Sequence, residues 1–579
     1  MYEEKETSTV NFVADLEKEK YTTETETLPI PTEHEELTLR RIVTSPKFHL
    51  YFICLIEFAE RGSFYGTGNR MGNFYQYPLP IGGNGAGAPG PGGEDPGALG
   101  KGLAIATTMG LLLKFTSYTF SIITGYISDV YVGQIKMLWI GVWLGVGSHI
   151  LFIIAALPSV LAHTNVAYGL SVVALLSLSL CTSFVKPVLL PLLLQQYPHK
   201  TNIVKTLPTG ERVIVDRDAS LQRMTMVFYW AINVGAFLSL ATAYSAQKVG
   251  YWLAFTVPLI IYMLMPIVLW RLQRDIKANE PSRESVIAES LKVLKVCYEW
   301  GWIKRYWNGQ FWDYARPANL IQQGRIGWRK KRAGFYEEKY VYDTKLTISA
   351  CTIFLYYVIY QMHSNMDEPM RSQAGSMEGK GVPNDLFSNF NPISIIVVMP
   401  ILDYGLYPLL RRYRINFKPV YRIFCGFMIG CLGSTVGAIV QWKVYETSPC
   451  GYSGATTCFE LHQQHSPLSR WLVAIEYALG GISECFAMTT GYEIAFERSP
   501  KKMKGFVLAL FMFTLAISSA IILPITPVFR DPYLIQPFAV CAGVGTLTAI
   551  VFLWRYWDLD KQMKLEGDHS LPESKSSSS

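Results

Sequence analysis

The chain has 579 residues, of which 50% are hydrophobic and 17% are charged. Soluble domains carry about 25% charged residues, so this composition excludes an ordinary soluble protein. The formal net charge is +7, and the basic residues stand between apolar runs rather than along one face, which argues against nucleic-acid binding. The sequence also lacks the Cys and His spacing that is typical of a zinc site.

Hydropathy predicts an all-α polytopic membrane protein with twelve spanning helices, each close to the roughly 20 residues that cross a bilayer. The predicted spans are 48–68, 102–124, 135–157, 166–194, 224–244, 250–270, 345–366, 391–410, 420–442, 469–491, 505–525 and 534–556. Six spans lie on each side of a polar stretch that is too long for an ordinary helical hairpin. We therefore expect two six-helix bundles, at 48–270 and 344–556, joined by a linker at 271–343.

The two ends of the chain are polar. Residues 1–47 are acidic and rich in Thr, and residues 557–579 close in a run of Ser, so we expect both to be disordered. Residues 1–47 contain no basic head followed by an apolar stretch, so no cleavable signal peptide is predicted. Lys and Arg gather in alternate loops, such as 200–223 and 411–422, and the positive-inside rule places these loops, the linker and both ends in the cytosol.

Two outer loops have a distinctive composition. Residues 82–102 are rich in Gly and Pro, but they contain no phosphate-binding GxxxxGK[ST] motif. Cys450 and Cys458 share another predicted outer loop, where the compartment permits oxidation. We predict a disulfide between them, with two free thiols as the alternative.

The first predicted span contains three charged residues, Glu57, Glu60 and Arg61. Each charge costs about 2.5 to 3.5 kcal/mol at the centre of a membrane helix, so these residues need partners or a function. Their spacing puts all three on one helical face, where two acids share one arginine. The spare carboxylate is suited to bind a proton, and a static ion-pair network is the alternative.

Further charged residues interrupt spans four and ten. Lys186 stands directly before Pro187, which frees a carbonyl and can break the helix at a binding site. Glu484 lies near the middle of span ten beside small residues and is a better candidate for a cavity acid than Glu476. The interpretation of Lys186 as a lysine that reaches the membrane surface is less favoured, because the cytosolic end of the span is distant.

Other polar residues in the spans have two possible roles. Lys114 and Asp403 either pair structurally or line the path, and His149 and His363 are more typical of interhelical hydrogen bonds than of a proton relay. Four further side chains either face a cavity or join neighbouring helices: Tyr118, Asn233, Gln361 and Asn391.

Five motifs, in chain order, resemble those of the proton-dependent oligopeptide transporter family, within the major facilitator superfamily. They are Glu57-x-x-Glu60-Arg61, Gly125-x-x-x-Asp129-x-x-x-Gly133, the lysine-proline element at Phe184 to Pro187, FYWAINVG at Phe228 to Gly235, and Ser483-Glu484. The Gly/Pro-rich outer loop, GERVIVD, FWDYARP and SQAG are similar to the fungal di- and tripeptide transporter branch. The resemblance covers about residues 45 to 560.

The resemblance implies a role for each matching residue. Glu57 and Glu60 would be the proton-coupling acids, Arg61 their partner, Lys186 the cation that they exchange with, and Glu484 the partner of the substrate's amino group. The family positions that line the peptide cavity match Tyr65, Tyr118, Asn233, Asn391 and, less directly, Gln361. Family members lie in the plasma membrane, which we expect here too.

The chain also departs from the family pattern. Gly62 follows the first motif where an aromatic residue is common, and Val188 follows Pro187 where the family often has Asn. Tyr360 stands where many bacterial members have a glutamate, and the alignment of Arg70 is ambiguous. The extracellular gate ion pair of the family therefore has no assigned counterpart in this sequence.

These observations predict a proton-coupled symporter that imports di- and tripeptides by alternating access, with protons as the coupling ion and no cofactor. One alternative is a carrier of nitrate or another small solute on the same scaffold, and another is a nutrient sensor that does not transport. A membrane enzyme is less favoured, because no nucleophile with a base and no metal set is found.

Overall fold

The computed structural model describes residues 29–557 apart from 30, 92, 200, 277–285, 325–337, 414–416, 453, 463 and 498–503. The remainder of the two predicted disordered ends, at 1–28 and 558–579, lies outside the described residues. The chain divides into two compact units. The smaller unit contains described residues up to Pro46 together with Tyr197–Met224, and the larger contains Lys47–Gln196 and the residues from Thr225 onward.

The smaller unit has a short helix and a three-stranded sheet, in which β1 pairs parallel to β3 and β2 pairs antiparallel to it. Its elements are α2 Glu33–Thr38, β1 Arg41–Ile42, β2 Ile203–Thr206 and β3 Arg212–Val215. The structure here differs from the disordered segment that we predicted for 1–47. The reason is local: Thr32 and Glu35 form a capping box at the start of α2, and strand pairing satisfies the backbone of β1.

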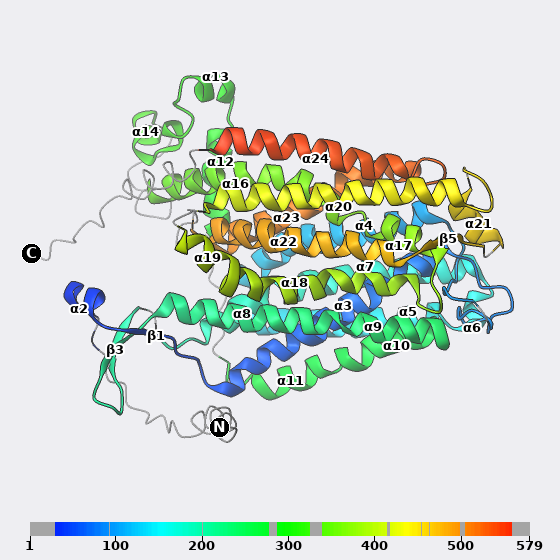
Figure 1. Ribbon diagram of the computed structural model, residues 1–579. Helices are drawn as coiled ribbons and strands as arrows, with labels where there is room; N and C mark the ends of the chain where they lie inside the picture. The colour runs from blue at the N-terminus through cyan, green and yellow to red at the C-terminus, as the bar shows by residue number, and fades with distance from the viewer. Residues whose placement is uncertain are drawn as a thin grey trace, which may run out of the picture. The chain divides into compact units, whose positions relative to one another are not determined.

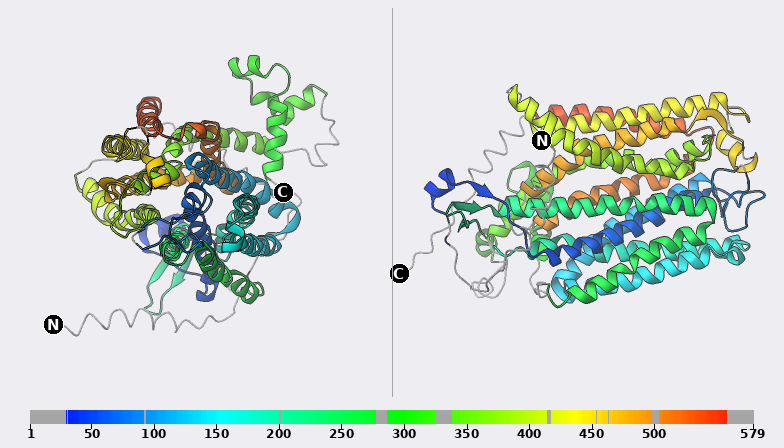
Figure 2. Two further views of the ribbon diagram at one scale, coloured as in Figure 1. Left: turned by 90° about the vertical axis from the view of Figure 1, so that its right-hand side faces the viewer. Right: turned by 60° about the horizontal axis from the view of Figure 1, so that its bottom comes forward.

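The larger unit is built of long helices that run alongside one another (Figure 1). In its N-terminal half they are α3 Phe52–Gln76, α4 Leu103–Ile127, α5 Gln134–Ala155, α7 Thr164–Gln195, the part of α8 (Arg217–Ala236) from Thr225 onward, α9 Leu238–Lys248, α10 Tyr251–Tyr262 and α11 Leu264–Leu272. In its C-terminal half they are α16 Glu338–Ser364, α18 Phe390–Pro400, α20 Pro419–Thr447, α22 Trp471–Glu497, α23 Lys504–Ile522 and α24 Ile535–Tyr556. The left view of Figure 2 shows these helices nearly end-on, and the two halves meet where α4 packs against α23.

Shorter elements connect the long helices. They are η1 Phe48–Tyr51, η2 Ser128–Val132, α6 Pro158–Leu161, α17 Asp367–Gly375, β4 Met377–Glu378, η4 Asn384–Asn389, η5 Ile401–Leu406, α19 Tyr407–Arg412, α21 Ala455–His462, β5 Ser466–Ser469 and η6 Leu523–Val528. The linker contains α12 Val286–Cys297, α13 Trp302–Trp307, η3 Asp313–Ala315 and α14 Pro317–Gln322.

Nine helical stretches in the described part of the chain are long and apolar enough to cross a membrane. The predicted first, seventh and eighth spans, which fall on α3, α16 and α18, are not among these nine. The sequences of α3 and α16 contain four charged residues each, and α18 has 11 residues before the π-helical turn η5. The number of twelve spans therefore stays a prediction.

Helix α7 continues through Pro187, which we had expected to be able to break it. Proline has no N–H and therefore leaves the carbonyl of the residue four positions earlier, Ser183, without its helical donor. The hydroxyl of Thr124 on α4 supplies a replacement and donates to that carbonyl at 2.5 Å. A neighbouring helix thus satisfies the carbonyl that Pro187 frees, and α7 remains continuous.

Candidate functional site

The charged residues of α3 form a buried cluster. The exposed fractions of Glu57, Glu60 and Arg61 are 3%, 1% and 3%. Arg61 Nε lies 3.3 Å from Glu57 Oε1 and also contacts Glu60 Oε2. The other oxygen of Glu60 accepts a hydrogen bond of 3.0 Å from Thr182 on α7. Two carboxylates therefore share one guanidinium, whose Nη2 has no hydrogen-bond partner among the described residues.

Lys186 approaches this cluster from α7. Its Nζ lies 3.8 Å from the centre of the Tyr118 ring on α4, which makes a cation–π contact. Lys186 also lies close enough to interact electrostatically with Glu57 and Glu60. No carboxylate in the described part of the chain comes within ion-pair distance of it. The ammonium group is thus near the acids without being paired to either.

Glu484 occupies the C-terminal half, on α22. Its Oε1 accepts a hydrogen bond of 2.9 Å from the amide of Asn391 on α18. Close packing of the two helices depends on Gly481, where an added Cβ would lie 3.0 Å from the Cβ of Ser394. The preceding residue, Ser483, bonds instead to Tyr360 and to a backbone carbonyl of α20, so it holds α22 in place.

The remaining predicted cavity residues have more varied surroundings. Tyr65 packs edge-on against Phe64 and lies within electrostatic range of Tyr118 and Glu484. Asn233 donates to the carbonyl of Tyr229 on its own helix at 2.9 Å, and Gln361 contacts the sulfur of Met488 at 3.3 Å. Among the described residues, neither Asn233 nor Gln361 hydrogen-bonds to another member of the predicted site.

The other polar residues of the spans differ in the contacts that they make. Lys114 pairs with Asp367 at 2.7 Å and so joins α4 to α17. His149 bonds to Ser63 and His363 to Ser434, each on a neighbouring helix, which confirms the interhelical interpretation. Glu476 is buried, and neither of its carboxylate oxygens has a hydrogen-bond partner in the described part of the structure. The side chain of Asp403 lies outside the described residues.

The predicted pair of outer cysteines is close in space. Cys450 and Cys458 have their sulfur atoms 2.04 Å apart, at bonding distance. The eight other cysteines are free thiols.

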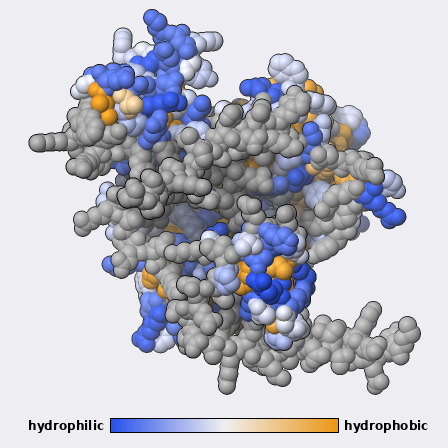
Figure 3. Space-filling view, turned by 90° about the vertical axis from the view of Figure 1, so that its left-hand side faces the viewer, coloured by the Kyte–Doolittle hydropathy of each residue, from blue (hydrophilic) through white to orange (hydrophobic). Residues whose placement is uncertain are grey.

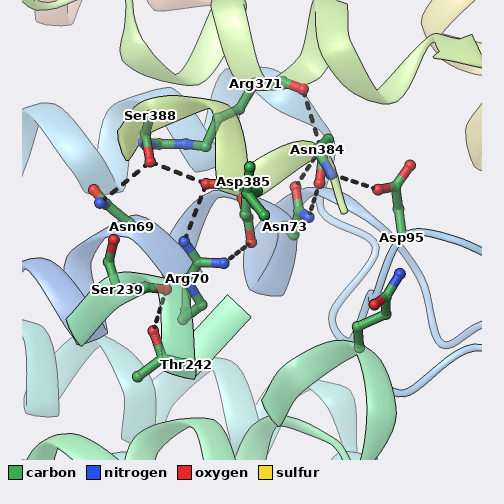
Figure 4. Close-up of polar contacts among 12 residues, drawn as sticks. Asn69, Arg70, Asn73, Asp95, Ser239, Thr242, Arg371, Asn384, Asp385 and Ser388 are labelled. Carbon is green, nitrogen blue, oxygen red and sulfur yellow. Dashed lines mark hydrogen bonds and ion pairs between the residues drawn. The ribbon is translucent and has the colours of Figure 1, made fainter. Parts of the chain in front are cut away.

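A second polar network joins the two halves near the end of α3 and was not predicted from the sequence (Figure 4). Arg70 donates to Asp385 of η4 at 2.8 Å, and both side chains are fully buried. One turn further along α3, the amide of Asn73 exchanges hydrogen bonds with the amide of Asn384. The buried pair assigns Arg70, whose alignment was ambiguous, to an ion pair between the halves.

The Gly/Pro-rich loop extends this network. Asp95 accepts two hydrogen bonds of 2.9 Å from Arg470, whose exposed fraction is 0%, and a third of 2.8 Å from the backbone of Asn384. Glu94 accepts from the backbone N–H groups of Gly379 and Gly381. The sequence contains a signal for these contacts, because Glu94 and Asp95 are the only acids of the run at 82–102. Their partners, however, lie about 285 to 375 residues further along the chain, so the sequence does not identify them.

Comparison with known proteins identifies the family. The family model described as "PTR2: POT family" matches residues 137–540, which is more than half of the chain. The chain belongs to the POT family. This confirms the proton-dependent oligopeptide transporter resemblance and places the protein in a family of transporters rather than enzymes.

Two relatives of this POT family member align over nearly its whole length. Peptide transporter PTR2 of Candida albicans is 43% identical over 542 residues, which are 93% of this chain and 86% of the relative. MFS-type transporter ucsM of Acremonium sp is 40% identical over 565 residues, which are 96% of this chain and 91% of the relative.

Solved structures agree on the fold. The crystal structure of the POT family transporter PepTSo superposes with a TM-score of 0.62 at 18% identity and covers 90% of this chain and 98% of its own. The predicted helical, multi-pass membrane fold is therefore confirmed, and the described residues add two small β-sheets to it.

Proposed function

We propose that this POT family member is a proton-coupled symporter that imports di- and tripeptides by alternating access. The observation that supports the proposal best is the buried cluster on α3, where two carboxylates share Arg61 while Lys186 lies nearby, with no acidic partner among the described residues. The printed names of relatives, including the peptide transporter of Candida albicans, support a peptide substrate.

The charges of the cluster explain how a proton could be coupled. With both acids ionised, Glu57, Glu60 and Arg61 together carry one negative charge, which attracts the ammonium of Lys186. One proton neutralises the cluster and releases Lys186 from that attraction. Lys186 is then available to a substrate carboxylate, so proton binding and peptide binding favour the same state.

The two ends of a peptide would contact different halves of the protein. The peptide carboxylate would pair with Lys186 on α7, and the peptide amino group with Glu484 on α22, beside Asn391. A bound peptide would thereby connect the N-terminal and C-terminal halves and favour a state in which they are closed around it. Tyr65, Tyr118, Asn233 and Gln361 would line the space between these charged ends.

The membrane potential supplies energy for this cycle. Moving one charge across about 100 mV yields about 2.3 kcal/mol, which supports roughly fiftyfold accumulation before any pH gradient is added. The coupling ion is the proton, and the cycle uses no bound cofactor. Both ends of the chain would lie in the cytosol, and the plasma membrane would hold the carrier.

A second candidate is transport of another small solute. It is favoured by the similarity to ucsM, whose name states a transporter type and no substrate, at 40% identity. Glu484 counts against a nitrate carrier, because a carboxylate repels an anion. A sensor that binds peptide without transporting it is the third candidate.

Uptake by the purified protein in proteoliposomes distinguishes these candidates. A labelled dipeptide should accumulate when an inward proton gradient is imposed and should only equilibrate without one. Gradient-driven uptake of nitrate but not of dipeptide would favour the anion carrier. Saturable dipeptide binding with no uptake under either condition would favour the sensor.

A further inference from the structure

The linker forms a small folded module over residues 286–324. Val293 and Cys297 of α12 pack with Phe311, Leu320 and the first turns of α16, so the module has a core of its own attached to the helical bundle. This core buries one side of the module, while a second set of large side chains lies outside it.

An exposed aromatic patch occupies the segment from the end of α12 through α13. Trp300 is 99% exposed, Trp307 is 82% exposed and Tyr306 is 64% exposed. Three further residues complete the patch: Tyr298, Trp302 and Ile303. Within the patch, Tyr298 packs edge-on against Trp302. Soluble proteins rarely expose several large apolar side chains in one short segment, and apolar patches on a surface mark binding sites.

The patch is held in a defined conformation. Arg305 donates hydrogen bonds to the carbonyl oxygens of Cys297, Glu299 and Trp300 at 3.1, 2.7 and 3.0 Å. Its guanidinium also lies 3.8 Å from the centre of the Tyr314 ring. The turn between α12 and α13 is therefore fixed from inside, and the aromatic side chains are presented outward.

Unpaired basic groups accompany the patch. Lys292 is used in an ion pair with Glu289, but Lys295 and Lys304 are exposed and have no acidic partner among the described residues. In Figure 3 the module forms the projection at the upper left, where hydrophobic side chains lie among hydrophilic ones. The chemistry of the surface is thus aromatic and cationic together.

The position of the module matches a membrane surface. In Figure 1, α13 lies beside the bundle at the level where α24 ends, and Figure 2 shows α12 to α14 projecting sideways from the ring of helices. The end of α24 itself exposes Trp554 by 80%, with Trp557 exposed by 56% just after it. Trp and Tyr are enriched where spanning helices leave the hydrocarbon, so the exposed Trp residues at the end of α24 indicate the level of the lipid headgroups.

We propose that this linker module docks on anionic lipid headgroups of the adjacent leaflet. Trp300, Trp307 and their aromatic neighbours enter the interfacial layer, while Lys295 and Lys304 attract negatively charged headgroups. In the orientation that we propose, this is the cytosolic leaflet. The inference depends on the position of the linker and not on which substrate the protein carries.

Hydrogen–deuterium exchange of the full-length protein tests this inference. The protein is placed in detergent, in nanodiscs of phosphatidylcholine alone, and in nanodiscs with about 30% phosphatidylserine. Backbone exchange over residues 298–310 should be at least about fivefold slower in the anionic nanodiscs than in the neutral ones, because basic residues near the surface bind anionic lipid. Equal exchange in all three environments would overturn the proposal.

Matched variants separate the aromatic and the cationic contributions. The double substitution Trp300→Ser with Trp307→Ser should restore fast exchange in both kinds of nanodisc, and Lys295→Gln with Lys304→Gln should abolish only the difference between them. Lys443→Gln, at an exposed site at the end of α20, serves as the control and should change neither rate. Exchange in α16 and α24 reports whether each variant is folded. Protection that persists in both double variants would show that another part of the chain covers the segment, and would also overturn the proposal.

Discussion

Glu57, Glu60 and Arg61 place three charges within two turns of a buried helix, where an uncompensated charge is costly. Arg61 compensates one negative charge, and Thr182 adds a hydrogen bond to Glu60. The remaining negative charge has no fixed partner among the described residues. A static network would be fully paired, so the spare charge favours a group that gains and loses a proton.

We predict that Glu57→Gln or Glu60→Gln leaves folding and peptide exchange intact but abolishes gradient-driven accumulation, since glutamine keeps the shape and cannot carry the proton. Concentrative uptake and counterflow in proteoliposomes measure the two activities separately. Glu446→Gln, at an exposed acid paired with Lys443, is the matched control and should behave as wild type. Undiminished accumulation in both cluster variants would contradict the proton-site assignment.

At the opposite end of the proposed cavity, Glu484→Ala should weaken dipeptide binding by roughly thirtyfold or more. Loss of one member of a charge-assisted contact costs about 2 to 5 kcal/mol, and 2 kcal/mol corresponds to that factor. Asn391→Ala should weaken binding less, because it removes only the hydrogen bond that orients the carboxylate. Competition binding with labelled dipeptide measures both effects.

Dipeptides with an acetylated amino group should compete poorly for binding to the wild-type protein, because they lack the charged amine that Glu484 would contact. If acetylated and free dipeptides compete equally, Glu484 does not contact the amino group. Displacement of both by nitrate would favour the anion carrier.

Among the elements, η4 carries the charge that pairs with α3 across the two halves. Burial raises the pKa of Asp385 to about 6, although the guanidinium groups of Arg70 and Arg371 act in the opposite direction. A solvated aspartate has a pKa of about 3.9. The closed outer network therefore binds a proton more tightly than an opened, solvated one does.

The sign of the pH dependence follows from these two pKa values. The free energy that protonation of Asp385 contributes to closure is fully present below about pH 4 and is lost as the pH rises through about 6. The ratio of open to closed outer faces should therefore increase about tenfold between pH 5 and pH 7. Distances between spin labels at Leu157 and Tyr533, in a variant without reactive thiols, measure this ratio. In Asp385→Asn the dependence should disappear, and an unchanged pH dependence there would assign it to another group.

At the scale of the whole molecule, the arrangement of Lys and Arg predicts the orientation in the membrane. A protease site inserted at Gly324, where an added Cβ would meet no atom of the described residues within 4 Å, should be cut only after permeabilisation of cells. A site inserted at Gly85, which also faces open space, should be cut on intact cells. The reverse pattern would overturn the proposed orientation.

The proposed outer disulfide can be tested by alkylation. Cys450 and Cys458 should resist alkylation until a reductant is added, because both lie in one predicted outer loop, in a compartment that permits oxidation. Mass spectrometry after labelling with and without reductant gives the answer, and free Cys541 serves as an internal reference after denaturation.

The sequence alone predicted the helical membrane fold and the charged cluster on α3, and it favoured the interhelical roles of His149 and His363. Each of these depends on local properties: the length of an apolar run, the helical spacing of charges, or the cost of burying a polar group. Local properties also predicted that Pro187 frees a carbonyl. Only the packing of α4 against α7 decided that Thr124 satisfies this carbonyl and keeps the helix continuous.

The pairings between the halves were decided by the tertiary structure. Arg70 and Asp385 are 315 residues apart, and Asp95 and Arg470 are 375 apart. Periodicity and hydropathy report whether a residue is buried, but they contain no information on which distant element lies opposite. For the same reason the sequence pointed to Lys186 as a partner for acids, whereas the folded chain places its ammonium group over the ring of Tyr118.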